Sequence, residues 1–196
     1  PWFGPTLNII MQMQSIWSGY SKEQYEYITD IIHNSDAKTV CELGTFVGTT
    51  AKQIWDKIEG SGKKLYLVDN YMFLPEDKRE KFFNAVKNSI EPNTRAIIPI
   101  LENSHTYDWT KHDFIVFGHH DAEHMLPDLQ KLIYSKVDYA IIGDGIPKCF
   151  QRTKATYELV SQMSGQGLHP QYYLNGLKKS FLIERYYISK KMKKQN

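Results

Sequence analysis

The stretch KTVCELGTFVGTTAKQIWDKI, Lys38 to Ile58, decides the fold. It begins as a short apolar run of the kind that forms a buried strand. It then turns at two glycines four residues apart, Gly44 and Gly48, and continues with the apolar spacing of a helix. In a strand-turn-helix unit of this type, the helix N-terminus faces the carboxyl end of the strand and favours an anionic group there. The stretch therefore predicts a ligand site in an α/β sheet.

The rest of the chain repeats this alternation of strand and helix. Strand patterns occur at KKLYLVDN, RAIIPILEN, HDFIVFG and VDYAIIGD, and helical patterns at 21–36, 75–90, 121–136 and 148–163. The last two strand patterns meet at Asn175-Gly176, a dipeptide that suits a tight hairpin. We therefore predict an α/β, Rossmann-like fold with a mostly parallel seven-stranded sheet, a C-terminal antiparallel hairpin and helices on both faces.

The bulk composition fits one globular domain. The chain has 196 residues, of which 41% are hydrophobic. We expect residues 1–20 to form an N-terminal lid, residues 21–189 the ligand-binding domain and residues 190–196 a basic tail. Because the sequence starts at Pro1, we expect either a processed protein or one domain of a larger polypeptide. A homodimer is a further possibility that the sequence leaves open.

Charge and cysteine content narrow the function classes. Of the 24 lysines and arginines, four lie in the last seven residues, which leaves 20 against 22 acidic side chains in the body. This balance argues against a nucleic-acid partner. No apolar run is long enough for a membrane span, and two cysteines, Cys41 and Cys149, suit a reduced cytoplasmic protein.

Acidic residues near the glycine turn indicate which ligand binds. The spacing E-x-G-x-x-x-G differs from that of dinucleotide and triphosphate loops. Glu42 would repel a pyrophosphate but can pair with an amine. Asp69, 21 residues after Gly48, ends the second strand, where a carboxylate can accept both hydroxyls of a ribose. A ligand with an ammonium group, a carboxylate and a ribose is S-adenosylmethionine, whose product is S-adenosylhomocysteine.

From about Ser21 onward, the chain resembles the class I S-adenosylmethionine-dependent methyltransferases. The resemblance rests on CELGTFVGTTAKQI, LYLVDN and the terminal hairpin. Within that group the chain is similar to O-methyltransferases of small molecules and sugars, including the macrocin O-methyltransferase type. The resemblance implies this set of cofactor-binding residues: Glu42, Gly44, Thr45, Phe46, Gly48, Thr49, Thr50, Asp69, Asn70, Tyr71, Asn103, Ser104, Phe117 and Gly118. Asn103 and Ser104 would flank the adenine, with an ordinary turn as the alternative. Asn70, Tyr71 and Met72 would line the nucleoside pocket.

A second segment, FGHHDAEHMLPDL from Phe117 to Leu129, follows the fourth strand and resembles the family segment D-G-D-H-x-x-E-x-x-x-x-D-L. Phe117 and His119 stand where that family has acids. In the metal-dependent members the first of these acids, at the position of Phe117, holds magnesium together with an acidic pair after the fifth strand. Asp144 matches one acid of a pair after the fifth strand. One oxygen ligand does not hold a hard cation, so the sequence argues against the metal site of that family, with an altered site at His119, Asp121 and Asp144 as the alternative.

The candidate catalytic residues lie in the same two segments. His120 matches the family's proton acceptor, and a histidine can act as a base at neutral pH. His119 and Asp144 are the further catalytic candidates, and Asp121 and Asp144 are the ligands to test if a metal binds. The alternative for the histidines is a polar loop without chemistry.

Aromatic residues in the first segment and in loops after strands have two interpretations. They could cover a sugar or planar acceptor, or pack the lid and a dimer contact. They are Trp2, Phe3, Trp17, Tyr20, Tyr71, Phe73, Tyr107 and Trp109.

The sequence thus leads to an S-adenosylmethionine-dependent methyltransferase acting on a hydroxyl of a small molecule or glycan. The alternative is a catalytically vestigial cofactor-binding module of a larger protein. A nucleic-acid methyltransferase is a weaker third interpretation, since the tetrapeptide that grips a flipped base is missing.

Overall fold

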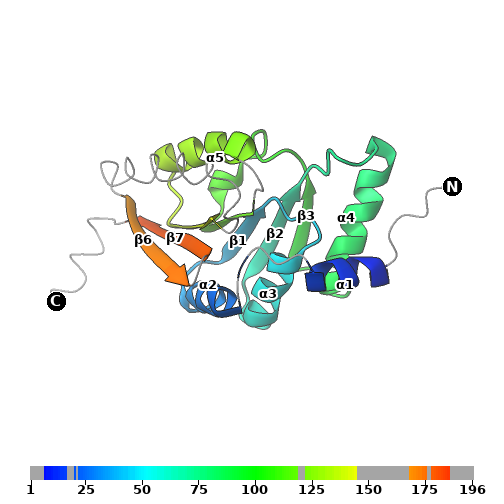
Figure 1. Ribbon diagram of the computed structural model, residues 1–196, viewed down its shortest axis with the longest axis horizontal. Coiled ribbons are helices and arrows are strands. Elements are labelled where there is room, and N and C mark those ends of the chain that lie inside the picture. Colours follow the sequence, from blue (N-terminus) through cyan, green and yellow to red (C-terminus); the bar gives the residue numbers. More distant parts are fainter. Residues whose placement is uncertain are drawn as a thin grey trace.

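The computed structural model describes residues 7–16, 20, 22–118, 122–144, 168–175 and 178–185 (Figure 1). The helices are α1 (Leu7–Ile16), α2 (Lys22–Asn34), α3 (Thr49–Ile58), α4 (Glu76–Ile90) and α5 (Ala122–Tyr134), with a 3₁₀ turn η1 (Trp109–Lys111). The strands are β1 (Thr39–Leu43), β2 (Lys64–Asp69), β3 (Ile97–Leu101), β4 (Phe114–Phe117), β5 (Tyr139–Asp144), β6 (Leu168–Asn175) and β7 (Lys178–Arg185).

The strands form one sheet in the order β3-β2-β1-β4-β5-β7-β6. The first five in this order are parallel to one another. β7 pairs antiparallel with both β5 and β6. The predicted Rossmann-like α/β fold with a parallel sheet is confirmed, whereas the predicted helix at 148–163 and the residue Gly176 of the predicted turn lie outside the described residues. Strand order reverses between β1 and β4, which places a crevice at their carboxyl ends.

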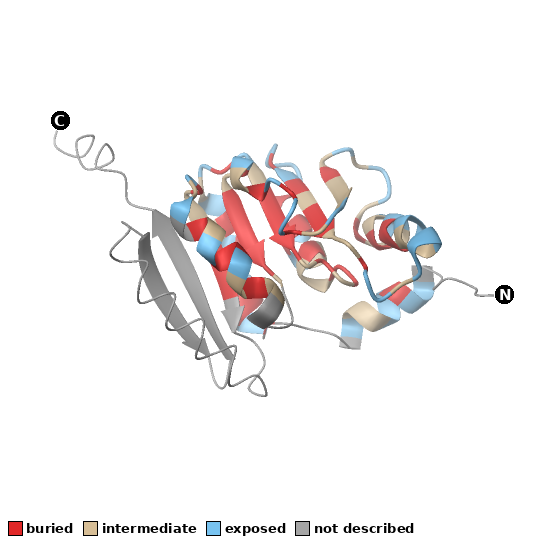
Figure 2. Ribbon diagram, turned by 90° about the horizontal axis from the view of Figure 1, so that it is seen from above, coloured by how far each residue is buried: buried red, intermediate tan, exposed pale blue. Residues whose placement is uncertain are grey.

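Apolar side chains on both faces of the sheet build two core clusters (Figure 2). One face packs against α2, α3 and α4, and Ile54 and Phe83 represent the helical side of this cluster. The other face packs against α5 through Met125 and Leu129. β4 is buried along its whole length and β1 at every residue after Thr39, as expected for parallel strands covered on both sides.

The segment predicted as an N-terminal lid contains the helix α1. Ile10 on this helix has no exposed surface and belongs to the core cluster shared by α2 to α4. The helix packs against α4. Trp2, Phe3 and Trp17 of the predicted lid lie outside the described residues. None of the helices described has the length and apolar character needed to cross a membrane.

Candidate functional site

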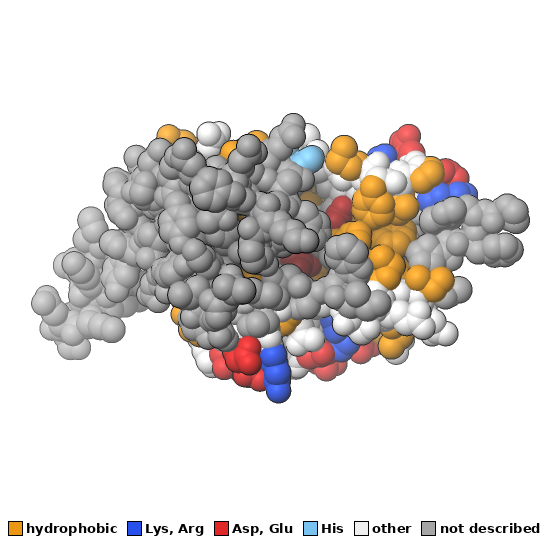
Figure 3. All heavy atoms as spheres, viewed as in Figure 1, with side chains coloured by type: hydrophobic (Ala, Val, Ile, Leu, Met, Phe, Trp, Pro, Cys, Tyr) orange, Lys and Arg blue, Asp and Glu red, His pale blue; other side chains and the backbone are white. Residues whose placement is uncertain are grey.

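A pocket of about 270 Å³ opens at the carboxyl ends of the parallel strands, at the point where strand order reverses. Figure 3 shows hydrophobic side chains gathered beside a hollow in which acidic atoms are visible. The described lining consists of Gly44, Phe46, Val68, Asp69, Asn70, Met72, Phe73, Glu102, Asn103, Ser104, Gly118 and His124. The loops after β1, β2, β3 and β4 therefore all contribute, as does the start of α5.

The glycine turn after β1 has a left-handed backbone at Gly44 (φ 85°) and at Gly48 (φ 79°). The N–H of Gly44 donates to the carbonyl of Val68 at 2.9 Å, which seats the turn beside β2. Gly44 lines the pocket, as predicted from the sequence. A glycine is required at this position because a positive φ is energetically costly for residues with a Cβ.

Gly48 has a different role from the one predicted. We expected it to let the backbone approach a ligand, but it does not line the pocket. A Cβ at this position would lie 2.9 Å from Val86 Cγ1 and 3.1 Å from Ile90 Cδ1. Gly48 is therefore needed for its left-handed turn and for close packing against α4.

Gly118, directly after β4, is the glycine that allows two backbones to meet at the pocket. Its N–H donates to the carbonyl of Leu43 at 2.7 Å. A Cβ on Gly118 would lie 2.7 Å from the carbonyl oxygen of Gly44. The close approach of β1 and β4 at the pocket floor thus depends on this residue.

Asp69, at the end of β2, connects the loop after β1 to the loop after β2. Its Oδ2 accepts the backbone N–H of Phe46 at 2.8 Å, and its Oδ1 accepts that of Tyr71 at 2.8 Å. The carboxylate also lines the pocket, and each carboxylate oxygen can accept more than one hydrogen bond. Asp69 therefore shapes the loops as well as facing the ligand space, a role that sequence spacing did not reveal.

Phe46 and Tyr71 carry the local strain of the site. Among the described non-glycine residues, only these two have positive φ, 50° and 46°. The hydroxyl of Tyr71 donates to the carbonyl of Phe46 at 2.7 Å. Strained backbone of this kind gathers at functional sites, where the surrounding contacts maintain it.

Tyr71 was predicted to line the nucleoside pocket, and this placement is wrong. Its side chain is fully buried and packs edge-on against Phe82 and Phe83. Its neighbours Asn70 and Met72 face the pocket instead. A positive φ at Tyr71 turns its ring into the core.

Glu42, predicted to pair with an amine, lies beneath the pocket rather than on its lining. It is 1% exposed, and among the described residues its Oε2 has no hydrogen-bond partner. Burial, followed by the nearby Asp69 charge, raises the pKa of Glu42 to about 8, although the Thr45 side chain lowers it in part. A cation that reached this carboxyl would favour its charged form.

The three threonines predicted to bind the ligand do not line the pocket. Thr45 is buried. The Thr49 hydroxyl donates to the carbonyl of Gln14 at 3.5 Å, and the Thr50 hydroxyl lies 3.2 Å from the hydroxyl of Tyr25. The side chains at the start of α3 therefore contact α1 and α2, and α3 has no side-chain cap at its N-terminus.

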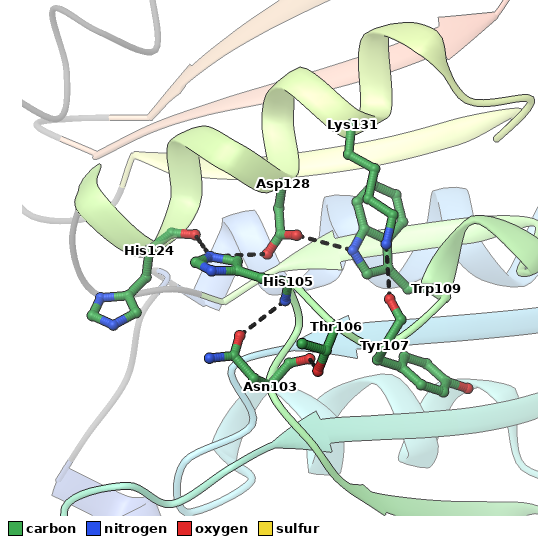
Figure 4. A network of polar contacts seen from close by, with 8 residues as sticks. All are labelled: Asn103, His105, Thr106, Tyr107, Trp109, His124, Asp128 and Lys131. Carbon is green, nitrogen blue, oxygen red and sulfur yellow. Dashed lines mark hydrogen bonds and ion pairs between the residues drawn. The ribbon is translucent and has the colours of Figure 1, made fainter.

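The loop after β3 forms the opposite wall, and a polar network fixes it to α5 (Figure 4). His105 Nε2 lies 2.8 Å from the carbonyl of His124 and 4.0 Å from Oδ2 of Asp128. The indole N–H of Trp109 donates to Asp128 Oδ1 at 3.0 Å, and Lys131 donates to the carbonyl of Tyr107 at 2.8 Å.

The predicted adenine-flanking residues lie in this wall. Asn103 and Ser104 both line the pocket, and the Asn103 side chain accepts the N–H of His105 at 2.9 Å in a tight turn. The turn interpretation and the pocket position are thus both correct for Asn103, because the turn presents the residue at the pocket.

Several predicted aromatic contacts are part of the core. Phe117, placed in the ligand site by the resemblance, is 1% exposed and packs against Trp109 at a centroid distance of 5.8 Å. Tyr20, Tyr107 and Trp109 are also buried. Of the described aromatic candidates for covering an acceptor, Phe73 is the one that lines the pocket with an exposed ring.

The proposed catalytic segment is described only in part. His119, His120 and Asp121 lie outside the described residues. Asp144 is placed by its backbone as the last residue of β5, and its side chain lies outside the description as well. Within the described part of the chain, no cluster of His, Cys, Asp and Glu could hold a metal ion.

Sequence reasoning missed three residues of the described lining, Val68, Glu102 and His124, whereas Met72 and Phe73 were among its candidates. Met72 and Phe73 are more than half exposed, at 60% and 57%. Their position directly after the second strand was the available signal, because loops at the carboxyl edge of a parallel sheet line its crevice. His124 lies on α5 within the segment from Phe117 to Leu129, four residues after His120.

The fold matches that of several solved methyltransferases. An O-methyltransferase from Bacillus cereus in complex with S-adenosylhomocysteine has a TM-score of 0.63 and 12% identity, covering 91% of this chain and 90% of that one. A proposed rRNA methylase from Clostridium thermocellum has a TM-score of 0.61 and 14% identity, with coverages of 84% and 94%. An S-adenosylmethionine-dependent O-methyltransferase from Thermotoga maritima has a TM-score of 0.61 and 8% identity, with coverages of 93% and 72%.

No protein-family model and no curated protein match the sequence. At these identities the structural likeness establishes the class I methyltransferase fold and leaves the acceptor open.

Proposed function

We propose that the protein binds S-adenosylmethionine in this pocket and transfers its methyl group to a hydroxyl of a small molecule or glycan. The charge of the pocket carries the proposal. Asp69 and Glu102 line it, whereas its described lining includes no lysine or arginine. Such a pocket suits a sulfonium cation with an ammonium group and disfavours a pyrophosphate.

The residues present fit the parts of this cofactor. Asp69 has acceptor capacity for ribose hydroxyls in addition to the two backbone N–H groups that it holds. Asn103 and Ser104 offer amide and hydroxyl groups to a base. Gly44 and Gly118 keep the pocket floor free of side chains, and the bound cofactor would supply an activated methyl group.

Methyl transfer also needs alignment with the acceptor and a group that takes its proton. We propose His120 as this base, because it follows β4 by three residues in the sequence and matches the proton acceptor of the family that the chain resembles. His119 and Asp144 are the further candidates for a catalytic role. His124, which lines the pocket, is the competing histidine.

A transfer assay tests this function. Purified protein is incubated with methyl-labelled S-adenosylmethionine and a panel of glycosides and phenols, and the labelled product is counted. We expect turnover that falls by about a hundredfold or more in His120→Ala, as is typical for loss of a catalytic base. The control His33→Ala, at an exposed site on α2, should retain full activity.

Retained activity in His120→Ala together with loss in His124→Ala would transfer the role of base to His124. Absence of turnover with every acceptor, despite cofactor binding, would favour the second candidate, a cofactor-binding module without transfer activity. That candidate is supported by Phe117, which stands at the position of a family metal ligand and is packed into the core.

A further inference from the structure

The N-terminal helix α1 holds the glycine turn through one side chain, Gln14. Its amide Nε2 donates to the carbonyl of Val47 at 2.7 Å and to the hydroxyl of Ser89 on α4 at 2.8 Å. Ser89 in turn donates to the carbonyl of Val86 at 2.6 Å. Gln14 thus connects the turn to a fixed point on α4.

Three backbone groups of two consecutive residues of the turn, Phe46 and Val47, are held by side chains from elsewhere. Asp69 accepts the N–H of Phe46, and Tyr71 donates to the carbonyl of Phe46. Gln14 then donates to the next carbonyl, that of Val47. Because Phe46 has positive φ, the turn needs these external hydrogen bonds to keep its conformation.

The contact between α1 and the turn is close on both sides of Gly48. A Cβ at Gly48 would lie 3.5 Å from Gln14 Nε2, and the Thr49 hydroxyl donates to the carbonyl of Gln14 at 3.5 Å. Ile10, one helical turn earlier, is fully buried in the core and anchors the helix. α1 therefore sits against the turn rather than in front of the pocket.

We propose that Gln14 is a positioning residue of the cofactor site, through which α1 sets the conformation of the glycine turn and hence the affinity for the cofactor. The proposal rests on the proposed function for its ligand. Gln14 does not line the pocket, so its effect passes through Val47 to Phe46 and Gly44, which do. Detachment of α1 would release the turn and weaken binding.

The test compares two isosteric substitutions on one helix. Gln14→Met keeps the side-chain volume and removes the amide donor, whereas Gln12→Met makes the same change at an exposed position of α1. Isothermal titration with S-adenosylhomocysteine should give about a tenfold larger Kd for Gln14→Met, the effect of losing the hydrogen bond to the turn at Val47. The Kd of Gln12→Met should equal that of the wild type.

A second measurement needs no ligand and separates this proposal from the proposed function. In the wild type, the N–H of Gly48 donates to the carbonyl of Thr45 at 2.8 Å, so its hydrogen exchange reports on the turn. Exchange of this amide should be faster in Gln14→Met and unchanged in Gln12→Met. Ser89→Ala, which removes only the α4 anchor, should give an intermediate rate.

Equal exchange at Gly48 in the wild type and in Gln14→Met would overturn the proposal, and so would an equal Kd. If the wild type does not bind S-adenosylhomocysteine at all, the proposed function fails, while the exchange experiment still decides whether Gln14 fixes the turn.

Discussion

Asp69 has two roles, of which the sequence predicted only the contact with the ligand. It joins the turn after β1 to the loop after β2 through two backbone N–H groups, and it presents its carboxylate to the pocket. A substitution here therefore changes the pocket wall as well as the ligand contact. Loss of binding in a variant of Asp69 has to be compared with loss of stability.

Asp69→Asn should show both effects. An amide has one acceptor oxygen, so its NH₂ group would face the N–H of Phe46 or of Tyr71. We expect a loss of stability of about 1–3 kcal/mol in urea unfolding, the cost of one unsatisfied donor. Affinity for S-adenosylhomocysteine should fall by about tenfold or more for the same reason. Asp56→Asn, in an exposed pair with Lys52, should change stability by no more than about 1 kcal/mol.

Gly118→Ala should be among the most damaging single-methyl additions. The new Cβ would meet the carbonyl oxygens of Gly44 and Leu43, which are backbone atoms and cannot rotate away. Gly62→Ala is the comparison, because nothing lies within 4 Å of its Cβ and only its positive φ opposes the change. Strain at Gly62 should cost about 1–2 kcal/mol, and thermal unfolding should show a larger loss for Gly118→Ala. Equal losses would contradict the close backbone contact.

Glu42 gives the site a pH dependence. Its folded-state pKa of about 8 lies above the ordinary value of 4.5, so the folded protein binds more protons than the unfolded chain between these pH values. Its contribution to stability is present in full below pH 4.5 and is lost as pH rises to about 8. Glu42→Gln, which cannot ionise, should therefore be more stable than the wild type at pH 8 and similar to it at pH 5 in urea unfolding. The same stability difference at both pH values would show that Glu42 does not titrate in this range.

At the level of elements, the loop after β3 is positioned by its attachment to α5. Trp109 and His105 both approach Asp128, whose side chain is 1% exposed. The connection from β3 to β4, which is described throughout, contains one 3₁₀ turn, η1, and no longer helix. The attachment to α5 therefore holds Asn103 and Ser104 on the pocket wall. The short loop thus depends on side-chain hydrogen bonds for its shape.

Two tryptophan-to-phenylalanine variants separate this hydrogen bond from simple packing. Trp109→Phe removes the donor to the buried Asp128 and should cost about 1–3 kcal/mol in urea unfolding. Trp55→Phe, on α3, removes an indole N–H that has no hydrogen-bond partner among the described residues. Both variants lose a similar ring volume, but only Trp109→Phe also loses a hydrogen bond. Trp55→Phe should therefore reduce the free energy of unfolding by less. A larger loss for Trp55→Phe would contradict a stabilising role for the Trp109–Asp128 hydrogen bond.

Elements were more predictable from the sequence than the directions of their side chains. Hydrophobic periodicity located β1 to β5 and their helices, because burial on two faces leaves a clear pattern. The side chains of Tyr71 and Phe117 were misplaced because a loop or strand end has no period to show which way it points. Gly48 was misinterpreted since its neighbours, Val86 and Ile90, are distant in sequence.

For the whole molecule, the order of the strands determines where the pocket lies, and the charge of its lining favours a cationic ligand. The pocket lies where strand order reverses, which the alternation of strands and helices made predictable. The attachment of α1 to the glycine turn was not predictable, because it depends on one amide that joins residues 14, 47 and 89. Long-range hydrogen bonds of this kind leave no periodic signal.

The central claim is that the acidic pocket at the ends of β1 to β4 binds the methyl donor. Isothermal titration of the wild-type protein with S-adenosylhomocysteine, with NADH as the matched nucleotide that carries a pyrophosphate, tests it most directly. The account predicts saturable binding of S-adenosylhomocysteine at one site per chain and none of NADH under the same conditions. Absence of binding by S-adenosylhomocysteine, or tighter binding of NADH, would contradict it.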